Sequence, residues 1–78
     1  MNTIEVLNDI FRQVFGDNSL NITQQTSADD VEDWDSLTHM ILITTIEAKF
    51  KIRFTQQEIL DQSNVGDLIN DIDRHLVA

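Results

Sequence analysis

Apolar side chains recur at intervals of three and four residues in three stretches of this chain. This spacing puts apolar residues on one face of a helix, so it predicts amphipathic helices rather than strands. The apolar positions are Ile4, Leu7, Ile10, Phe11, Val14 and Phe15, then Leu42, Ile43, Ile46 and Phe50, then Val65, Leu68, Ile69, Ile72 and Leu76. We therefore expect an all-α fold with a core drawn from every helix, and with Asp67, Asp71 and Asp73 facing water.

The ends of the first two helices are marked by caps and glycine, since the chain has no proline. Asn2 followed by Glu5 resembles a capping box, and Gly16 supplies a stop for the first helix. The second helix is expected over residues 36–50. A left-handed backbone at Lys51, just after it, would be strained because the residue is not glycine.

A capping box at Thr55 and Glu58 predicts a short third helix that ends near residue 61. Ile59 and Leu60 are expected to face inward from it. The last helix has two candidate N-caps, Ser63 and Asn64.

Seventy-eight residues make one domain, residues 1–78, with a thin core. Five basic against fourteen acidic side chains give a formal charge of -9, which argues against nucleic acid and anionic membranes and favours basic protein partners. The chain has no cysteine, so a thiol can come only from a cofactor. The first residues lack the basic region and apolar run typical of a signal peptide, and no apolar segment approaches the roughly 20 residues of a membrane span, so we expect neither. We expect a cytoplasmic monomer.

The triplet Asp35-Ser36-Leu37 joins an acidic stretch to the second helix. Asp35 is a good N-cap, because its carboxylate can accept unpaired N–H groups and complements the positive helix end. Ser36 then takes the first helical position, where free N–H groups and the helix dipole favour a phosphate. The site suits a phosphorylated group.

The triplet, its position after a long acidic loop and the small acidic helical chain around it resemble the acyl carrier protein family over essentially the whole chain. The resemblance implies a four-helix bundle with a short third helix and a long first loop. It also implies that Ser36 receives 4'-phosphopantetheine from coenzyme A, flanked by Asp35 and Leu37, and carries acyl or aminoacyl groups as thioesters. Such a protein is a carrier and not an enzyme.

The partners implied are a phosphopantetheinyl transferase, which uses magnesium near Asp35, and acyl-loading and acyl-transfer enzymes. Carriers of fatty-acid synthesis usually show several acids along the serine helix, whereas Glu47 is the main acid here. Docking is therefore expected to be more hydrophobic, with Ile41 exposed. Candidates for the acyl pocket or partner surface are Met40, Ile41, Ile43, Ile46, Glu47, Ile59 and Leu60.

Residues 17–35 show neither helical nor strand periodicity and are expected to form the long loop. Leu20, Ile22 and Val31 should anchor it, and a short helical turn is expected near Ser27. The acidic stretch 29–35 lacks the glycine and spacing of a calcium loop, so no metal site is predicted.

Two alternative functions are compatible with the sequence. An unmodified acidic interaction domain of the same fold would differ only in not using Ser36. A small hydrolase would need a base for Ser36, and the chain has two histidines but no nucleophile elbow. His39, one turn beyond Ser36, and His75 are expected to be exposed residues without chemistry.

Overall fold

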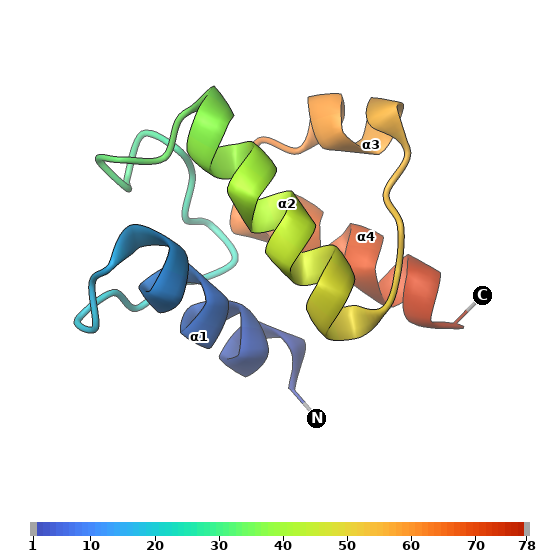
Figure 1. The fold of residues 1–78 in the computed structure, drawn as a ribbon, viewed down its shortest axis with the longest axis horizontal. Coiled ribbons are helices and arrows are strands. Elements are labelled where there is room, and N and C mark those ends of the chain that lie inside the picture. Colours follow the sequence, from blue (N-terminus) through green and yellow to red (C-terminus); the bar gives the residue numbers. More distant parts are fainter. Residues whose placement is uncertain (1, 78) are drawn as a thin grey trace.

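The computed structural model describes residues 2–77 and contains four α-helices in that range (Figure 1). They are α1 (Thr3–Phe15), α2 (Ser36–Phe50), α3 (Gln56–Asp61) and α4 (Val65–Val77). α1 packs on α2 and α4, while the short α3 lies on the opposite side of α2 from α1. The expected all-α bundle with a long first loop and a short third helix is confirmed. None of the helices within residues 2–77 has the length and apolarity needed to cross a membrane.

The helices begin and end at the expected residues. The side chain of Asn2 accepts the N–H of Ile4 at 3.1 Å, so it caps α1, although the expected box with Glu5 is not formed. Gly16 has a left-handed backbone with φ of 63°. Lys51 adopts φ of 58° after α2, so the condition for strain at this non-glycine residue is met.

Polar side chains also cap the starts of α3 and α4 by accepting free backbone N–H groups. Thr55 and Glu58 form the predicted reciprocal capping box of α3. Of the two candidate caps of α4, Asn64 is the one that accepts a backbone N–H, from Asp67 at 2.9 Å. The other candidate, Ser63, instead donates its hydroxyl to the Asp67 carboxylate at 2.8 Å.

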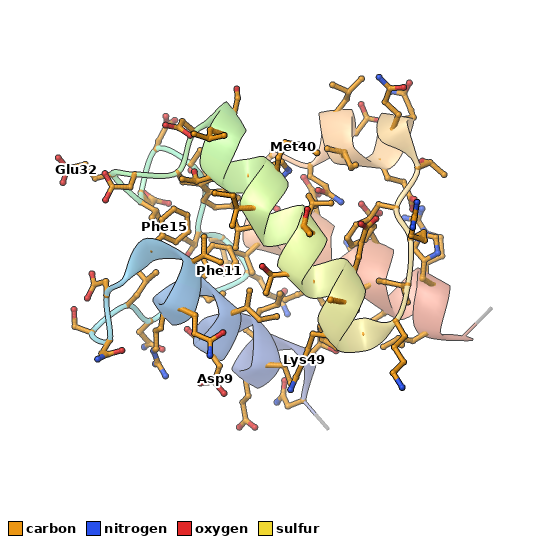
Figure 2. The ribbon with its side chains drawn as sticks, viewed as in Figure 1. Asp9, Phe11, Phe15, Glu32, Met40 and Lys49 are labelled. Atoms are coloured by element: carbon orange, nitrogen blue, oxygen red, sulfur yellow. The ribbon has the colours of Figure 1, made fainter. Side chains whose placement is uncertain are left out.

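The core lies between α1, α2 and α4 and is covered on one side by the first loop. Figure 2 shows Phe11 and Phe15 pointing from α1 into this region, where the ring of Phe11 meets Trp34 edge-on at 5.2 Å. The buried apolar residues are Leu7, Ile10, Phe11, Ile22, Val31, Trp34, Leu42, Ile43, Ile46, Phe54, Val65, Leu68 and Ile72.

Three sequence expectations about burial were wrong. Leu76 is exposed in the last turn of α4, whereas Phe50, the last residue of α2, is partly buried and packs against the core as expected. Leu60 is 72% exposed, because a helix of six residues offers about one inward position per turn and Ile59 occupies it. Asp71 was expected to face water but is buried, with 8% of its surface exposed. Its carboxylate accepts a hydrogen bond from Gln62 and forms an ion pair with Arg74.

The long loop is held by polar contacts as well as by its apolar anchors Leu20, Ile22 and Val31. Arg12 donates to the carbonyl of Leu20 at 2.7 Å, and Asn8 accepts the N–H of Ile22 at 2.8 Å. A single hydrogen-bonded turn is present where a short helical turn was expected, since the N–H of Asp30 donates to the carbonyl of Ser27 at 2.9 Å. Backbone pairing with the start of α4 holds the same segment, as Val65 donates to the Thr26 carbonyl at 2.8 Å.

Candidate functional site

The start of α2 presents Ser36 to solvent. Asp35 caps the helix by accepting the N–H of Thr38 at 3.0 Å, and the Thr38 hydroxyl accepts the N–H of Asp35 at 2.8 Å. The N–H of Thr38 also holds the pKa of Asp35 below its ordinary value, so the capping carboxylate is charged at neutral pH. Ser36 follows as the first helical residue and is exposed.

The four serines of the chain differ in what their hydroxyls contact. Ser19 donates to Asp17 at 2.6 Å, Ser63 donates to Asp67 at 2.8 Å, and Ser27 lies 3.4 Å from a carboxylate oxygen of Asp30. Among the serines, all of which lie within residues 2–77, only the Ser36 hydroxyl has no hydrogen-bond partner in the protein. It is therefore free to form a bond outside the fold.

A groove of about 560 Å³ runs from Ser36 between α2 and α3. Met40 points toward α3 in Figure 2 and forms one apolar wall, with Ile59 and Leu60 opposite. The full lining is Ala28, Trp34, Asp35, Ser36, His39, Met40, Ile59, Leu60, Gln62 and Ser63. A second depression, of about 600 Å³ between α1 and α2, contains no serine.

The structure divides the other candidate residues into three groups. Leu37 and Ile41 are exposed beside the groove, as expected for Ile41. Ile43 and Ile46 belong to the fully buried core and do not line the groove. Glu47 accepts the N–H of Phe54 at 2.9 Å, so its carboxylate holds the link to α3.

His39 is not the exposed, unengaged residue that was expected. It is half-buried and stacks on Trp34 with 5.9 Å between ring centres. Its Nδ1 accepts the indole N–H of Trp34 at 3.1 Å, and its Nε2 lies 3.1 Å from the side-chain oxygen of Gln62. Burial lowers the pKa of His39, and the bond to Gln62 offsets part of this effect. With both ring nitrogens engaged, His39 cannot serve Ser36 as a general base.

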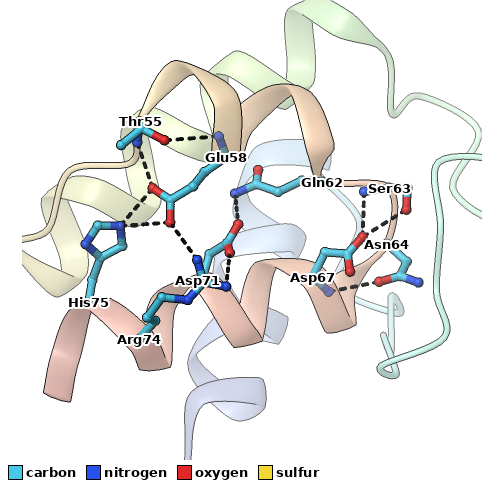
Figure 3. Close-up of polar contacts among 9 residues, drawn as sticks. All are labelled: Thr55, Glu58, Gln62, Ser63, Asn64, Asp67, Asp71, Arg74 and His75. Atoms are coloured by element: carbon cyan, nitrogen blue, oxygen red, sulfur yellow. Dashed lines mark hydrogen bonds and ion pairs between the residues drawn. The ribbon is translucent and has the colours of Figure 1, made fainter. Parts of the chain in front are cut away.

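His75 is also not a free surface residue, because it bonds to Glu58 across α3 and α4 (Figure 3). Its Nε2 lies 2.9 Å from Glu58 Oε1. The N–H of Thr55 and the bond to His75 lower the pKa of Glu58. Arg74 reaches both Glu58 and Asp71, so this cluster ties the start of α3 to α4.

The acidic stretch before Ser36 is solvent-exposed, as the Glu32 side chain shows in Figure 2. Its residue Asp30 accepts the N–H of Ser27 and thereby holds the loop. Within residues 2–77 no group of three metal-ligating side chains converges.

The residues of the groove that sequence reasoning missed are five: Ala28, Trp34, His39, Gln62 and Ser63. The one available signal was Trp34, the single tryptophan of the chain, placed next to Asp35 inside an otherwise acidic stretch. Gln62 gives no signal, because its contacts are to residues of other elements.

Comparison with known proteins agrees with this geometry. The family described as "Phosphopantetheine attachment site" matches residues 5–72. The chain belongs to the phosphopantetheine-bearing acyl carrier protein family. The solution structure of the holo acyl carrier protein of Geobacter metallireducens superimposes on this chain with a TM-score of 0.92, and the two sequences are 47% identical. The match covers 99% of this chain and 88% of the Geobacter metallireducens protein. A comparison with curated protein sequences gave no match.

Membership of the acyl carrier protein family establishes three properties. The protein is a carrier of acyl groups and not an enzyme. Its cofactor is covalently attached 4'-phosphopantetheine, which supplies the thiol that this cysteine-free chain lacks. The residues at the start of α2 fit that group, because they offer an exposed hydroxyl with no competing partner at a helix N-terminus.

Proposed function

We propose that Ser36 is the residue that bears the phosphopantetheine and that its cargo is presented to enzymes from the groove between α2 and α3. The observation that carries the proposal is the free, exposed hydroxyl of Ser36, in contrast to the engaged hydroxyls of the other serines. The Ser36 oxygen would bond to the pantetheine-bearing phosphorus of coenzyme A. The hydroxyl proton would be lost and adenosine 3',5'-bisphosphate would leave.

The test is loading of the apo protein with coenzyme A, magnesium and a broad-specificity phosphopantetheinyl transferase. Intact mass should increase by one phosphopantetheinyl group, and peptide mapping should place it on Ser36. Ser36→Ala should gain none, while Ser19→Ala, the matched control outside the groove, should load like wild type. A folded wild type that stays unmodified would favour the unmodified interaction domain, and a group on another serine would contradict the assignment to Ser36.

Asp35 serves this proposal by fixing the first turn of α2 and by placing a charged carboxylate beside Ser36. Asp35→Ala should slow loading more than it lowers stability, since loss of a cap costs only about 0.5 to 2 kcal/mol. Comparing the loading rate with urea unfolding separates the two effects.

We further propose that the transferase and the acyl-loading and acyl-transfer enzymes dock on an apolar surface around Ser36. Leu37, Met40, Ile41 and Leu60 are exposed there, and the one acid of α2 is engaged with the backbone of Phe54. Large exposed apolar side chains that cluster in this way are typical of interaction sites.

Ile41→Glu should therefore raise the KM of transferase loading several-fold. Ala48→Glu, which adds the same charge two turns further along the same exposed face, should not. Equal KM values for the two variants would remove Ile41 from the interface.

A further inference from the structure

Three polar side chains from three elements are bonded in series at the inner side of the groove. They are His39 of α2, Gln62 immediately after α3, and Asp71 of α4. The Nε2 of His39 lies 3.1 Å from the side-chain oxygen of Gln62, and the Gln62 amide nitrogen donates to Asp71 Oδ2 at 2.9 Å. Figure 3 shows the second bond, between the end of α3 and α4.

The direction of each bond is set by the one before it. The indole N–H of Trp34 can only donate, so His39 Nδ1 carries no proton and Nε2–H donates to Gln62. The Gln62 oxygen is thereby turned toward His39, and its NH₂ group toward Asp71. The second oxygen of Asp71 forms an ion pair with Arg74 at 3.1 Å. Within residues 2–77 no buried side-chain nitrogen or oxygen lacks a partner, so the series is fully satisfied.

These bonds lie between the groove and the interior of the bundle. Leu42, Ile46 and Leu68 are fully buried there and belong to the continuous core. An alkyl chain that entered between α2 and α3 toward α4 would have to separate His39 from Gln62 or Gln62 from Asp71. Asp71 is buried, so separation would leave a desolvated carboxylate with fewer hydrogen bonds.

We propose that this carrier holds a short acyl group in the surface groove, and that the His39–Gln62–Asp71 series excludes long alkyl chains from the bundle interior. The proposal rests on the proposed attachment at Ser36. The groove offers a short cargo apolar contact with Met40 and Ile59, and the partly buried Gln62 retains an amide hydrogen and an oxygen lone pair for a polar substituent.

The experiment loads the full chain with butanoyl or dodecanoyl phosphopantetheine, using the matching acyl coenzyme A and a transferase. Methyl NMR then reports on core residues Ile46, Leu68 and Ile72, and on Met40 and Ile59 in the groove. In the wild type, both acyl groups should shift only the groove signals, and the two melting temperatures should agree within about a degree.

Gln62→Leu removes both bonds of Gln62, and His39→Leu, a second and independent variant, removes the first. In either variant the dodecanoyl group should shift the core methyl signals and raise the melting temperature above that of the butanoyl form. Gln57→Leu is the matched control, because this exposed α3 glutamine bonds only to Asp61, and it should behave as wild type.

Core shifts in dodecanoyl-loaded wild type would overturn the inference, as would two folded variants that both keep the chain out of the core. Mass spectrometry of each sample separates this failure from failure at Ser36. A protein loaded on Ser36 whose core shifts contradicts only the exclusion of long chains, whereas a protein that takes up no group contradicts the attachment and the inference together.

Discussion

Trp34 lies between the groove beside Ser36 and the core of the bundle. The indole is 7% exposed, meets the ring of Phe11 edge-on on one side and stacks on His39 on the other. Aromatic pairs in these arrangements add stabilisation beyond the area they bury. The wall of the groove beside Ser36 is therefore fixed by the same side chain that packs on α1.

The first prediction at the residue scale concerns pH. The pKa of His39 in the folded protein lies below its ordinary value of 6.5 because burial disfavours the charged ring. Below about pH 6.5 the unfolded chain therefore binds more protons at His39 than the folded protein does. The free energy of unfolding is unaffected by His39 above this pH, and it decreases as the pH falls toward the lower pKa of the folded state. The loss should be well under the ~1.4 kcal/mol per pH unit allowed for one proton, since solvent screens a half-buried ring.

Urea unfolding at pH 7.5 and 5.5 measures this loss, in a His75→Gln background that leaves one histidine. His39→Phe in the same background should lose less stability over that interval. Equal losses with and without His39 would assign the pH dependence to other groups.

The second prediction compares two phenylalanines. Phe11 is fully buried, so Phe11→Ala should cost about 3 to 5 kcal/mol and leave the protein largely unfolded. Phe50 is partly buried at the edge of the core, so Phe50→Ala should cost less than Phe11→Ala and still give a cooperative melt. Thermal melts by circular dichroism test the order, and a Phe50 variant as unstable as the Phe11 variant would contradict it.

At the scale of elements, α2 is defined by different chemistry at its two ends. Its start is stabilised by the reciprocal bonds of Asp35 and Thr38. Its end is closed by Lys51, whose N–H donates to the carbonyl of Glu47 while its backbone is left-handed. Glycine adopts the left-handed conformation without steric cost, whereas a residue with a Cβ atom, such as Lys51, is strained in it.

Lys51→Gly should therefore raise the free energy of unfolding by roughly 0.5 to 1 kcal/mol. Lys49→Gly is the control, because it places the same residue inside the last turn of the helix, where glycine is unfavourable by about as much. Urea denaturation measures both. A loss of stability in both variants would show that left-handed strain at Lys51 is not significant.

The sequence predicts those features of the helices that depend on neighbouring residues, and not those that depend on residues distant along the chain. The bounds of α1 and α2 follow from caps and periodicity, which involve residues within a turn of one another. The burial of Asp71 and the exposure of Leu60 depend on which residues of other elements lie opposite, and periodicity carries no such information. The motif singled out Ser36 as a candidate, whereas no sequence signal pointed to Gln62 at the other side of the groove.

At the scale of the whole molecule, charge is unevenly distributed. The formal charge is -9, and an exposed acidic stretch made of Asp29, Asp30, Glu32 and Asp33 precedes Ser36. Lys49, Lys51 and Arg53 gather instead around the far end of α2. A basic partner enzyme would therefore be attracted to the end that carries Ser36, where the proposed apolar docking surface lies.

The same charge destabilises the folded state, because folding brings like charges together. Added sodium chloride should raise the melting temperature by a few degrees up to about 0.3 M, since it screens exposed charges. Asp29→Asn combined with Asp33→Asn should melt higher than wild type at low salt and gain less from added salt. Both side chains are exposed and hold no hydrogen bond in the fold, so the double variant changes charge alone.

Magnesium chloride at matched ionic strength separates screening from ion binding. Equal rises with the two salts would indicate screening, and a larger rise with magnesium that disappears in the double variant would place a weakly bound ion on the acidic stretch. A melting temperature that stays flat or falls across the sodium chloride series would show that self-repulsion of this chain does not limit its stability.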